Sequence, residues 1–415
     1  MGGPPERHSG LGTFASLRNP DYRYLWIGNL FNTAGQWIQQ ITVGWLVWDL
    51  SHSPFLVGLV GGLRALPFLF MGPLGGVLAD RVDRRRLLMT TQTLLAVVAV
   101  AFAVVVALGW MQVWHALVFT FITGCGFAVN QPVRQSLIAN TVPRRDLGNA
   151  IALSAMAANS TRIIGPAVGG VLIVAFGPAG NFFIQAGLFL CMVAIIFPIK
   201  VRYREAVASS SASAVRNLKE GFTYVWGNRT LFGLMMLSFV PSLFVMPVIQ
   251  MLPVFTEEVL HSKANVYGYL VAAFGVGGLL ATLTLASFGS SIRSGLLGIV
   301  ALVASSIIVI LFALSSHLPL SLLLLVALGA SQMTFRVNNN TLVQTMAPDE
   351  LRGRVMSIYH LEHGFMPLAS FILGLSAELF SAPSAVAVSG MLSLAVIAAL
   401  MLGIKRMRDV SNLRA

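Results

Sequence analysis

The segment from Gly76 to Leu88 reads GVLADRVDRRRLL and joins two long apolar stretches of the chain. A loop between two membrane-spanning helices must lie at a membrane surface, so its composition indicates which surface that is. Four of the six residues from 81 to 86 are arginines, and short loops rich in Lys and Arg remain on the cytoplasmic side. The segment therefore predicts a polytopic membrane protein with this loop in the cytoplasm.

The composition of the whole chain points to the same class of protein. Hydrophobic residues make up 56% of the 415 residues, charged residues make up 10%, and the mean hydropathy is +0.80. A soluble domain carries about 25% charged residues, so lipid is the expected solvent here. The net charge of +12 is spread between apolar runs, which argues against a nucleic-acid partner. Cys125 and Cys191 each lie in an apolar run and suggest neither a disulfide framework nor a zinc site.

Twelve segments have the length and hydropathy of transmembrane helices, which need about 20 apolar residues. They are 24–48, 54–79, 87–109, 114–139, 149–175, 181–199, 230–255, 265–288, 295–314, 318–345, 353–379 and 384–404. Of the 27 Lys and Arg residues, Lys263 alone falls in an outer loop, four fall within spans, and the other 22 lie on the side of the Gly76–Leu88 loop. This asymmetry predicts an all-α, multi-pass protein of the bacterial plasma (inner) membrane with both termini in the cytoplasm. The polar first 23 residues predict no cleavable signal peptide.

The longest predicted loop divides the twelve spans six and six. We therefore expect a cytoplasmic N-terminal segment (1–23), an N-terminal six-helix bundle (24–199), a cytoplasmic linker (200–229), a C-terminal six-helix bundle (230–404) and a cytoplasmic tail (405–415). A shift of 205 residues pairs Gly124 with Gly329 and Gly169 with Gly374, which suggests that the halves are repeats. Within the linker, residues 215–226 form either a short interfacial helix or a solvated connection.

The loop residues Gly76, Leu78, Ala79, Asp80, Arg81, Arg84, Arg85 and Leu88 together resemble the loop-2/3 signature of the major facilitator superfamily of transporters. Asp83 stands where the family usually has glycine. The stretches RNPDYRYLW (18–26), GLRALP (62–67) and GPAVGG (165–170) resemble the branch that contains macrolide exporters and the enterobactin exporter. The resemblance covers about residues 18 to 405. It implies twelve helices in two pseudo-symmetric bundles, with the substrate site between them near the middle of the membrane.

The same resemblance implies a cytoplasmic latch between the two halves. Its members would be Gly76, Asp80, Arg81, Arg84 and Arg85, with Asp80 facing the start of span 11. The alternative is that the arginines only orient the helix. Arg134 lies about 14 Å from the cytoplasmic end of span 4 and is expected to support the latch. Many proton-coupled drug antiporters carry an arginine midway along this span, so the position of Arg134 weighs against proton coupling.

Four residues of span 5 resemble the core of the antiporter motif of drug exporters, namely Gly165, Pro166, Gly169 and Gly170. Proline bends a helix by removing one backbone hydrogen bond, and glycines four residues apart allow close helix contact. The motif favours export over import. Ordinary helix packing is the alternative.

Ionisable residues inside spans are costly and usually functional or paired. Glu362 is the only acidic residue well inside a span, and Arg336 lies at a similar depth, with Arg64 as the competing partner. The coupling candidates are Glu362, Arg336, Arg64, Arg162, His360 and His363. The two histidines lie at i and i+3 and suit proton relay better than a metal site, because further ligands are not evident. A structural ion pair is the alternative to a coupling role.

Span 1 carries a polar stripe at i, i+4 and i+8, formed by Asn32, Gln36 and Gln40. Such a stripe should face a cavity or another helix rather than lipid. Trp37 is expected to add apolar contact with a substrate, as are Phe239 and Met246 of span 7. Packing and lipid contact are the alternatives for these apolar side chains.

These features predict a secondary transporter that exports small amphipathic molecules, such as drugs, macrolides or siderophore-like compounds, by alternating access. Protons are the candidate counter-ion, and a role in multidrug resistance would follow. Lysophospholipid transport and solute import remain alternatives within the superfamily. No Walker, GxSxG or HExxH motif occurs, which argues against ATP as the energy source and against a membrane-embedded enzyme. A membrane receptor is disfavoured because there is no sizeable soluble domain. We expect no cofactor and no metal, membrane lipid and a small molecule as partners, and a monomer.

Overall fold

The computed structural model describes residues 12–143, 146–200, 220–288, 295–348 and 351–403. The side chains of residues 72–81 and of some other helical residues lie outside this description. The described residues form helices joined by turns and contain no strand. The prediction of an all-α fold is therefore confirmed.

The helices of the N-terminal half follow the order of the predicted spans. They are η1 (Gly12–Arg18), α1 (Pro20–Ser51), α2 (Pro54–Arg81), α3 (Arg84–Ala107), α4 (Val113–Thr141) and α5 (Leu147–Ile196). Helix α5 contains two predicted spans in series, which are separated by a turn at Gly177 with φ of +67°. A positive φ is costly for residues with a Cβ, so glycine suits this turn.

The C-terminal half has more interruptions. A helical stretch at 220–227 precedes it. Its elements are α7 (Arg229–Val240), η3 (Pro241–Val245), α8 (Met246–Gln250), α9 (Leu252–Val254), η4 (Phe255–Val259), α10 (Ala264–Phe288), α11 (Gly295–Ala313), α12 (Leu318–Met346), α13 (Arg352–Tyr359), η6 (His360–Gly364), α14 (Met366–Leu379) and α15 (Ala382–Gly403). The series α7 to η4 covers predicted span 7, and the series α13 to α14 covers predicted span 11.

Helical structure covers each of the twelve predicted ranges in the part of the chain that is described. Eight of the described helical segments are long and apolar enough to cross a membrane, and Pro54–Phe68 and Met366–Leu379 are shorter apolar helices. Helix α1 is absent from both groups, although it is 32 residues long. Its polar face accounts for this, because the Asn and Gln residues of span 1 lower its hydropathy.

Prolines explain where the C-terminal half departs from regular helix. Pro241, Pro247 and Pro253 follow one another at intervals of six residues along span 7. Each lacks a backbone N–H and its ring clashes with the carbonyl of residue i−4. The chain accommodates them with two wide π-type turns, η3 and η4, a form that occurs frequently at functional sites. In span 11, the tight 3₁₀ turn η6 ends shortly before Pro367.

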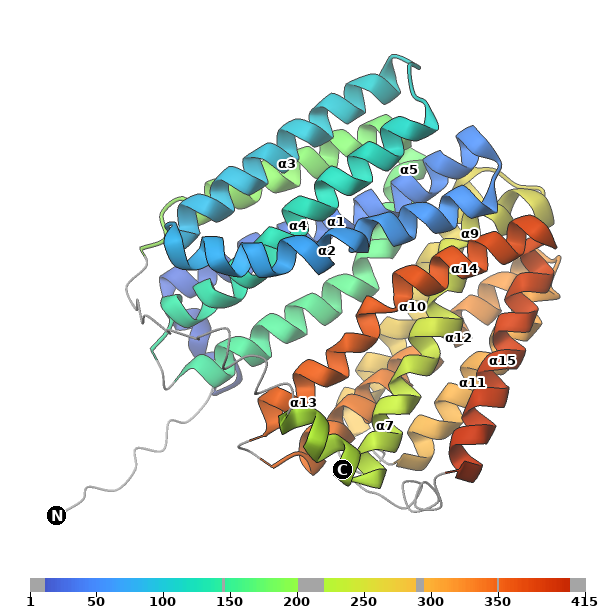
Figure 1. The fold of residues 1–415 in the computed structure, drawn as a ribbon. Helices are drawn as coiled ribbons and strands as arrows, with labels where there is room; N and C mark the ends of the chain where they lie inside the picture. Colours follow the sequence, from blue (N-terminus) through green and yellow to red (C-terminus); the bar gives the residue numbers. More distant parts are fainter. Residues whose placement is uncertain (1–11, 144–145, 201–219, 289–294, 349–350, 404–415) are drawn as a thin grey trace.

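Two bundles are visible in Figure 1, and they meet along two pairs of helices. Helix α1 packs on α5 and α2 packs on α4 in the first bundle, while α12 packs on α10 and α11 in the second. The bundles contact each other chiefly through α2 with α14 and through α5 with α10. We call the end of the molecule that carries Gly12 and Gly403 the terminal end, and the opposite end the far end. Figure 1 shows the bundles converging at the far end and diverging toward the terminal end.

Small residues permit this convergence. A Cβ added to Gly170 of α5 would lie 2.5 Å from the carbonyl oxygen of Gly268 in α10. A Cβ added to Gly58 of α2 would lie 2.5 Å from the carbonyl oxygen of Ser370 in α14. At such distances the two backbones touch, as is typical of close helix contacts in membranes.

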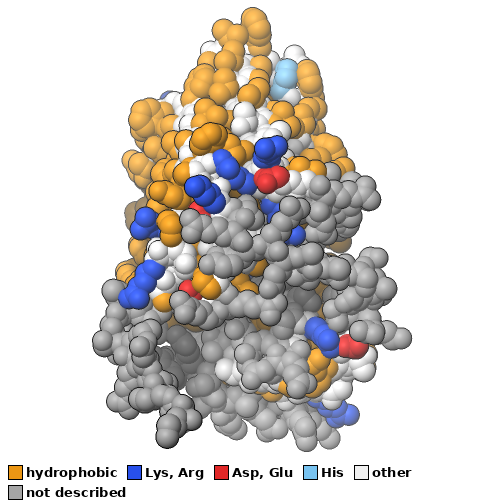
Figure 2. All heavy atoms as spheres, turned by 90° about the vertical axis from the view of Figure 1, so that its left-hand side faces the viewer, with side chains coloured by type: hydrophobic (Ala, Val, Ile, Leu, Met, Phe, Trp, Pro, Cys, Tyr) orange, Lys and Arg blue, Asp and Glu red, His pale blue; other side chains and the backbone are white. Residues whose placement is uncertain are grey.

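The surface is divided between apolar flanks and a basic terminal end. Large hydrophobic side chains point outward along the helices, for example Leu94 and Val97 of α3, each 58% exposed. On the face shown in Figure 2, hydrophobic side chains cover the upper flank, and Lys and Arg side chains gather below them. Arg18, Arg23 and Arg86 are exposed at the terminal end. This distribution fits apolar flanks in lipid and charged ends in water.

Candidate transport cavity

A cavity lies between the two bundles in the described part of the chain. Its volume is about 310 Å³, and both halves contribute to its wall. The N-terminal half supplies residues from α1, α2 and α4, and the C-terminal half supplies residues from η3, α8, α10, α12 and α14. Most of the wall is apolar, and its polar members are Gln39, Gln40, Arg64, Thr120, Ser242, Gln250, Tyr267, Gln332 and Arg336.

Five of the residues singled out from the sequence line this cavity, namely Trp37, Gln40, Arg64, Met246 and Arg336. They come from four different helices and from both halves. The structure therefore brings together side chains that are up to 299 residues apart in sequence, from Trp37 to Arg336.

The other members of the predicted cavity set lie elsewhere. Asn32 is fully buried and accepts a hydrogen bond from Gln92 of α3 at 2.7 Å. Gln36 is half-buried and is not among the cavity-lining residues. Phe239 packs edge-on against Phe365, with ring centroids 5.4 Å apart. Residues i and i+8 differ by about 80° around a helix, since each residue turns it by about 100°. Asn32 and Gln40 can therefore face different neighbours.

Thiol labelling should separate these two positions of α1. In a protein whose Cys125 and Cys191 have been replaced, Gln40→Cys should react with a water-soluble thiol reagent, because its side chain borders the cavity. Asn32→Cys is the matched control on the same helix and should react at least about ten-fold more slowly, because Asn32 is fully buried. Equal labelling of both positions would contradict the cavity assignment.

Arg64 enters the cavity wall from the middle of α2. Its guanidinium donates to Oε1 of Gln40 at 2.5 Å and lies 5.6 Å from the ring centroid of Phe127. A guanidinium over an aromatic face is attracted by the ring's quadrupole. Both contacts are to neutral side chains.

Arg336 approaches the only carboxylate that the sequence places deep within a span. Its Nη2 lies 3.8 Å from Oε1 of Glu362, whose side chain is only 4% exposed. The hydroxyls of Ser238 in α7 and Ser242 in η3 are also close to this carboxylate. Of the two partners proposed for Glu362 from the sequence, Arg336 is the one within ion-pair distance.

The predicted latch lies only partly within the described side chains. Those of Gly76, Asp80 and Arg81 lie outside them. Arg84 donates to Oδ1 of Asn140 at 2.6 Å. Arg85 donates to the backbone carbonyl of Phe197, and Arg134 donates to Oε1 of Gln131 at 2.5 Å. These three contacts are all made inside the N-terminal half. The side chains of Arg162, Pro166, His360 and His363 also lie outside the described residues.

The glycines of the span 5 motif face two different neighbours. A Cβ on Gly165 would lie 2.6 Å from the Trp37 ring, and one on Gly169 would lie 3.4 Å from Ile38. Both positions pack α5 on α1. Gly170 instead faces Gly268 across the interface between the halves. Gly165 and Gly169 therefore pack helices within the N-terminal bundle, whereas Gly170 packs this bundle against the C-terminal one.

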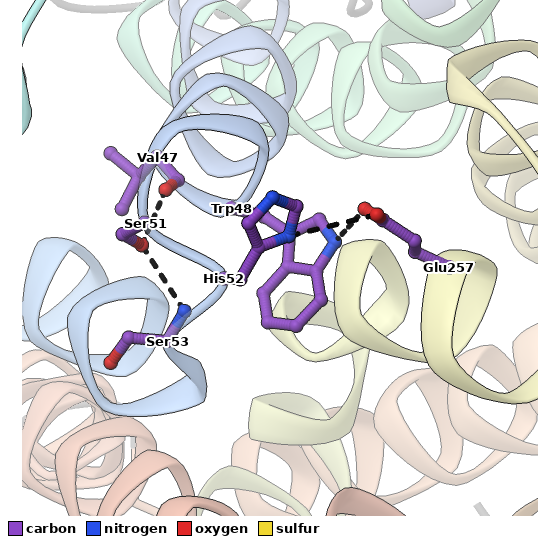
Figure 3. A network of polar contacts seen from close by, with 6 residues as sticks. All are labelled: Val47, Trp48, Ser51, His52, Ser53 and Glu257. Atoms are coloured by element: carbon purple, nitrogen blue, oxygen red, sulfur yellow. Dashed lines mark hydrogen bonds and ion pairs between the residues drawn. The ribbon is translucent and has the colours of Figure 1, made fainter.

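A polar network that sequence reasoning did not identify joins the halves at the far end (Figure 3). The indole Nε1 of Trp48 donates to Oε2 of Glu257 at 2.8 Å, and Nδ1 of His52 lies 3.6 Å from Oε1 of the same carboxylate. Nearby, the Ser53 hydroxyl donates to Glu378 at 2.8 Å. Burial raises the pKa of Asp49, and the Glu257 carboxylate adds to this shift. The partners are more than 200 residues apart, so no local pattern could reveal them.

Several described contacts between the halves lie in the far half of the molecule. They include the network above, the Tyr267 hydroxyl that donates to the carbonyl of Ile41, and the two close glycine contacts. Among the described side chains, no group of three or more His, Cys, Asp or Glu residues is placed to hold a metal ion. The arrangement is a cavity between two bundles that are joined at one end.

Comparisons with known proteins agree with this architecture. The family model for transmembrane secretion effectors matches residues 11–413. The staphyloferrin A transporter of Staphylococcus aureus is 24% identical, covering 86% of this chain and 90% of that protein. The multidrug efflux pump Tap of Mycolicibacterium fortuitum is also 24% identical, covering 83% of this chain and 86% of the pump.

Solved structures show the same fold at low sequence identity. The nucleoside transporter NupG is 14% identical with a TM-score of 0.71, over 92% of this chain and 98% of its own. A bacterial homologue of the human lysosomal transporter Spinster, in an inward-facing and unoccupied conformation, is 14% identical with a TM-score of 0.68, over 94% of this chain and 96% of its own. With a family model that spans nearly its whole length, this chain belongs to the transmembrane secretion effectors of the major facilitator superfamily, and it is a membrane transporter rather than an enzyme.

Proposed function

We propose that this protein exports small amphipathic molecules from the cytoplasm by alternating access. The observation that carries the proposal is the cavity between the bundles, which both halves line while several described contacts between them lie toward the far end. A site shared by two rigid bundles can be opened to either side by rocking one bundle against the other.

The orientation of the chain in the membrane indicates the side to which the cavity opens. The distribution of Lys and Arg supports placing both termini, and therefore the terminal end, in the cytoplasm. The far end then faces outward and is closed, and the bundles diverge toward the cytoplasm. A cavity in this state would take up its substrate from the cytoplasm or the inner leaflet, as an exporter in the plasma membrane requires.

Relatives with related activities support a small-molecule substrate. Their names describe transport of staphyloferrin A, multidrug efflux and macrolide efflux. The cavity wall supports an amphipathic substrate, because flexible Met246, Met333 and Met366 alternate with polar groups and methionine adapts to varied ligands. We expect the protein to act as a monomer surrounded by lipid.

Protons are the counter-ion that we propose. Glu362 is the only acidic residue that the sequence places well within a span, and it lies beside Arg336. Buried ionisable residues of this kind mark proton and ion pathways in transporters. His360 and His363 are two residues or fewer from Glu362 in the chain, and they are the next candidates for the relay.

Counterflow in proteoliposomes tests the proposed function. Purified protein should exchange labelled for unlabelled amphipathic compounds, and an imposed pH gradient should drive their net movement from the side that bears the termini. Empty liposomes and protein-free extracts are the controls. Absence of saturable counterflow for a panel of neutral, cationic and anionic compounds would contradict the proposal, and pH-driven movement in the opposite direction would indicate import.

A further inference from the structure

We propose that the cavity binds amphipathic molecules that carry an anionic group, and that the guanidinium of Arg64 holds this group. The inference rests on the proposed transport function and deepens it by naming the class of substrate.

The charged side chains of the cavity wall favour an anionic ligand. Two guanidinium groups, those of Arg64 and Arg336, line the cavity, and its described lining includes no carboxylate. Glu362 is the only acidic residue that the sequence places well within a span. It is not among the residues that line the cavity; its side chain is only 4% exposed, with Oε1 3.8 Å from Nη2 of Arg336. The wall presented to a substrate is therefore positive.

The two arginines differ in how their charge is balanced. Arg336 has Glu362 within ion-pair distance. Arg64 is beyond 4 Å from every described carboxylate, and its described partners are the Gln40 amide and the Phe127 ring. An uncompensated charge in a membrane interior is costly. A carboxylate or phosphate group would compensate it, since guanidinium binds such groups through two parallel hydrogen bonds.

Unpartnered polar atoms in the same wall provide an independent observation. Nε2 of Gln332 has no hydrogen-bond partner, and the side chain is 5% exposed. The Thr120 hydroxyl also lacks a partner and is 2% exposed. Both residues line the cavity. Buried polar groups are almost always hydrogen-bonded, so these two point to a ligand, and both can donate to the oxygens of an anion.

The remainder of the wall would contact the apolar part of such a molecule. Phe68 and Phe274 lie in the wall together with the three methionines named above. A cationic compound would find the same apolar contacts but would face the uncompensated guanidinium of Arg64. An amphipathic anion is therefore the class that matches both the charge and the polarity of the cavity.

Three probes of the same size and different charge test the inference: 1-naphthoate, 1-naphthamide and 1-naphthylmethylammonium. Their equilibrium binding is measured with the labelled compounds and the full-length protein in lipid nanodiscs, without any need for transport. We expect 1-naphthoate to bind at least about ten-fold more tightly than the other two, because a charge-assisted hydrogen bond is about twice as strong as a neutral one. Arg64→Gln should weaken 1-naphthoate binding by about ten-fold and leave 1-naphthamide binding within about two-fold. Arg64→Lys should retain a preference for the anion.

Arg86→Gln is the matched control, because it removes one exposed positive charge far from the cavity and should leave all three affinities unchanged. Equal binding of 1-naphthoate and 1-naphthamide by the wild-type protein would overturn the inference, as would an unchanged preference in folded Arg64→Gln. The wild-type ranking decides the question even if Arg64→Gln does not fold. Counterflow of neutral or cationic compounds alone would leave the proposed function intact and overturn only the anion preference.

Discussion

Gly170→Val is expected to hold the two halves apart at the far end and to reduce transport by at least about ten-fold. A Cβ at this position would lie 2.5 Å from the carbonyl oxygen and 2.8 Å from the Cα of Gly268. Both are backbone atoms, so the helices themselves must separate. Overpacking of this kind costs about 1–3 kcal/mol, which shifts a two-state equilibrium by about 5- to 150-fold.

The shift can be measured as labelling of Val47→Cys in a protein that lacks Cys125 and Cys191, since Val47 is a fully buried far-end residue that does not line the cavity. We expect its reactivity with a membrane-impermeant thiol reagent to rise in the Gly170→Val background. Gly187→Val is the control, because a Cβ at Gly187 in the same helix has no neighbouring atom within 4 Å. Unchanged transport and labelling in Gly170→Val would show that this glycine contact does not control closure of the far end.

Glu362→Gln is expected to abolish transport driven by a pH gradient while substrate counterflow continues. Glutamine preserves the size of the side chain and one acceptor oxygen, but it has no carboxyl group to take up and release a proton. If Glu362 is the proton carrier, the loaded cavity can still change sides, but the pH gradient no longer drives it. Both activities are measured in the same proteoliposomes, with and without an imposed gradient.

Glu220→Gln is the matched control for this substitution. Glu220 lies in the predicted linker (200–229) and forms an ion pair with Arg354, so its loss should leave pH-driven transport intact. If the Glu362–Arg336 pair only supports the fold, Glu362→Gln should instead lower expression or stability and retain coupling in the surviving protein. Full pH-driven accumulation by a well-folded Glu362→Gln protein would exclude Glu362 as the carrier.

Hydropathy and the distribution of arginines predict the helical spans because both depend on composition over about 20 residues. The depth of a residue within the membrane is predicted as well, because each residue adds a constant rise along the helix axis. Equal depth predicts that Arg336 can pair with Glu362. Depth could not choose between Arg336 and Arg64 as the partner, because that choice depends on how α2, α12 and the helices of span 11 are rotated about their axes.

Helix rotation also explains why only part of the polar stripe of α1 borders the cavity. Asn32 faces Gln92 of α3, whereas Gln40 meets Arg64, and only tertiary packing decides this. The π-type turn η3 places Ser242 in the cavity wall, an irregularity of span 7 that was not predicted from the sequence. The contact between Trp48 and Glu257 joins different halves of the chain and has no signal in local sequence.

Distances between spin labels at both ends of the molecule test alternating access most directly. One pair replaces Arg86 and Thr345, which are exposed at the terminal end. The other replaces Trp110 and Leu314, which are 69% and 74% exposed at the far end. When substrate or an acidic pH shifts the population, we expect the terminal-end distance to shorten and the far-end distance to lengthen. Distances that stay constant at both ends during active transport, or that change in the same direction, would contradict the account.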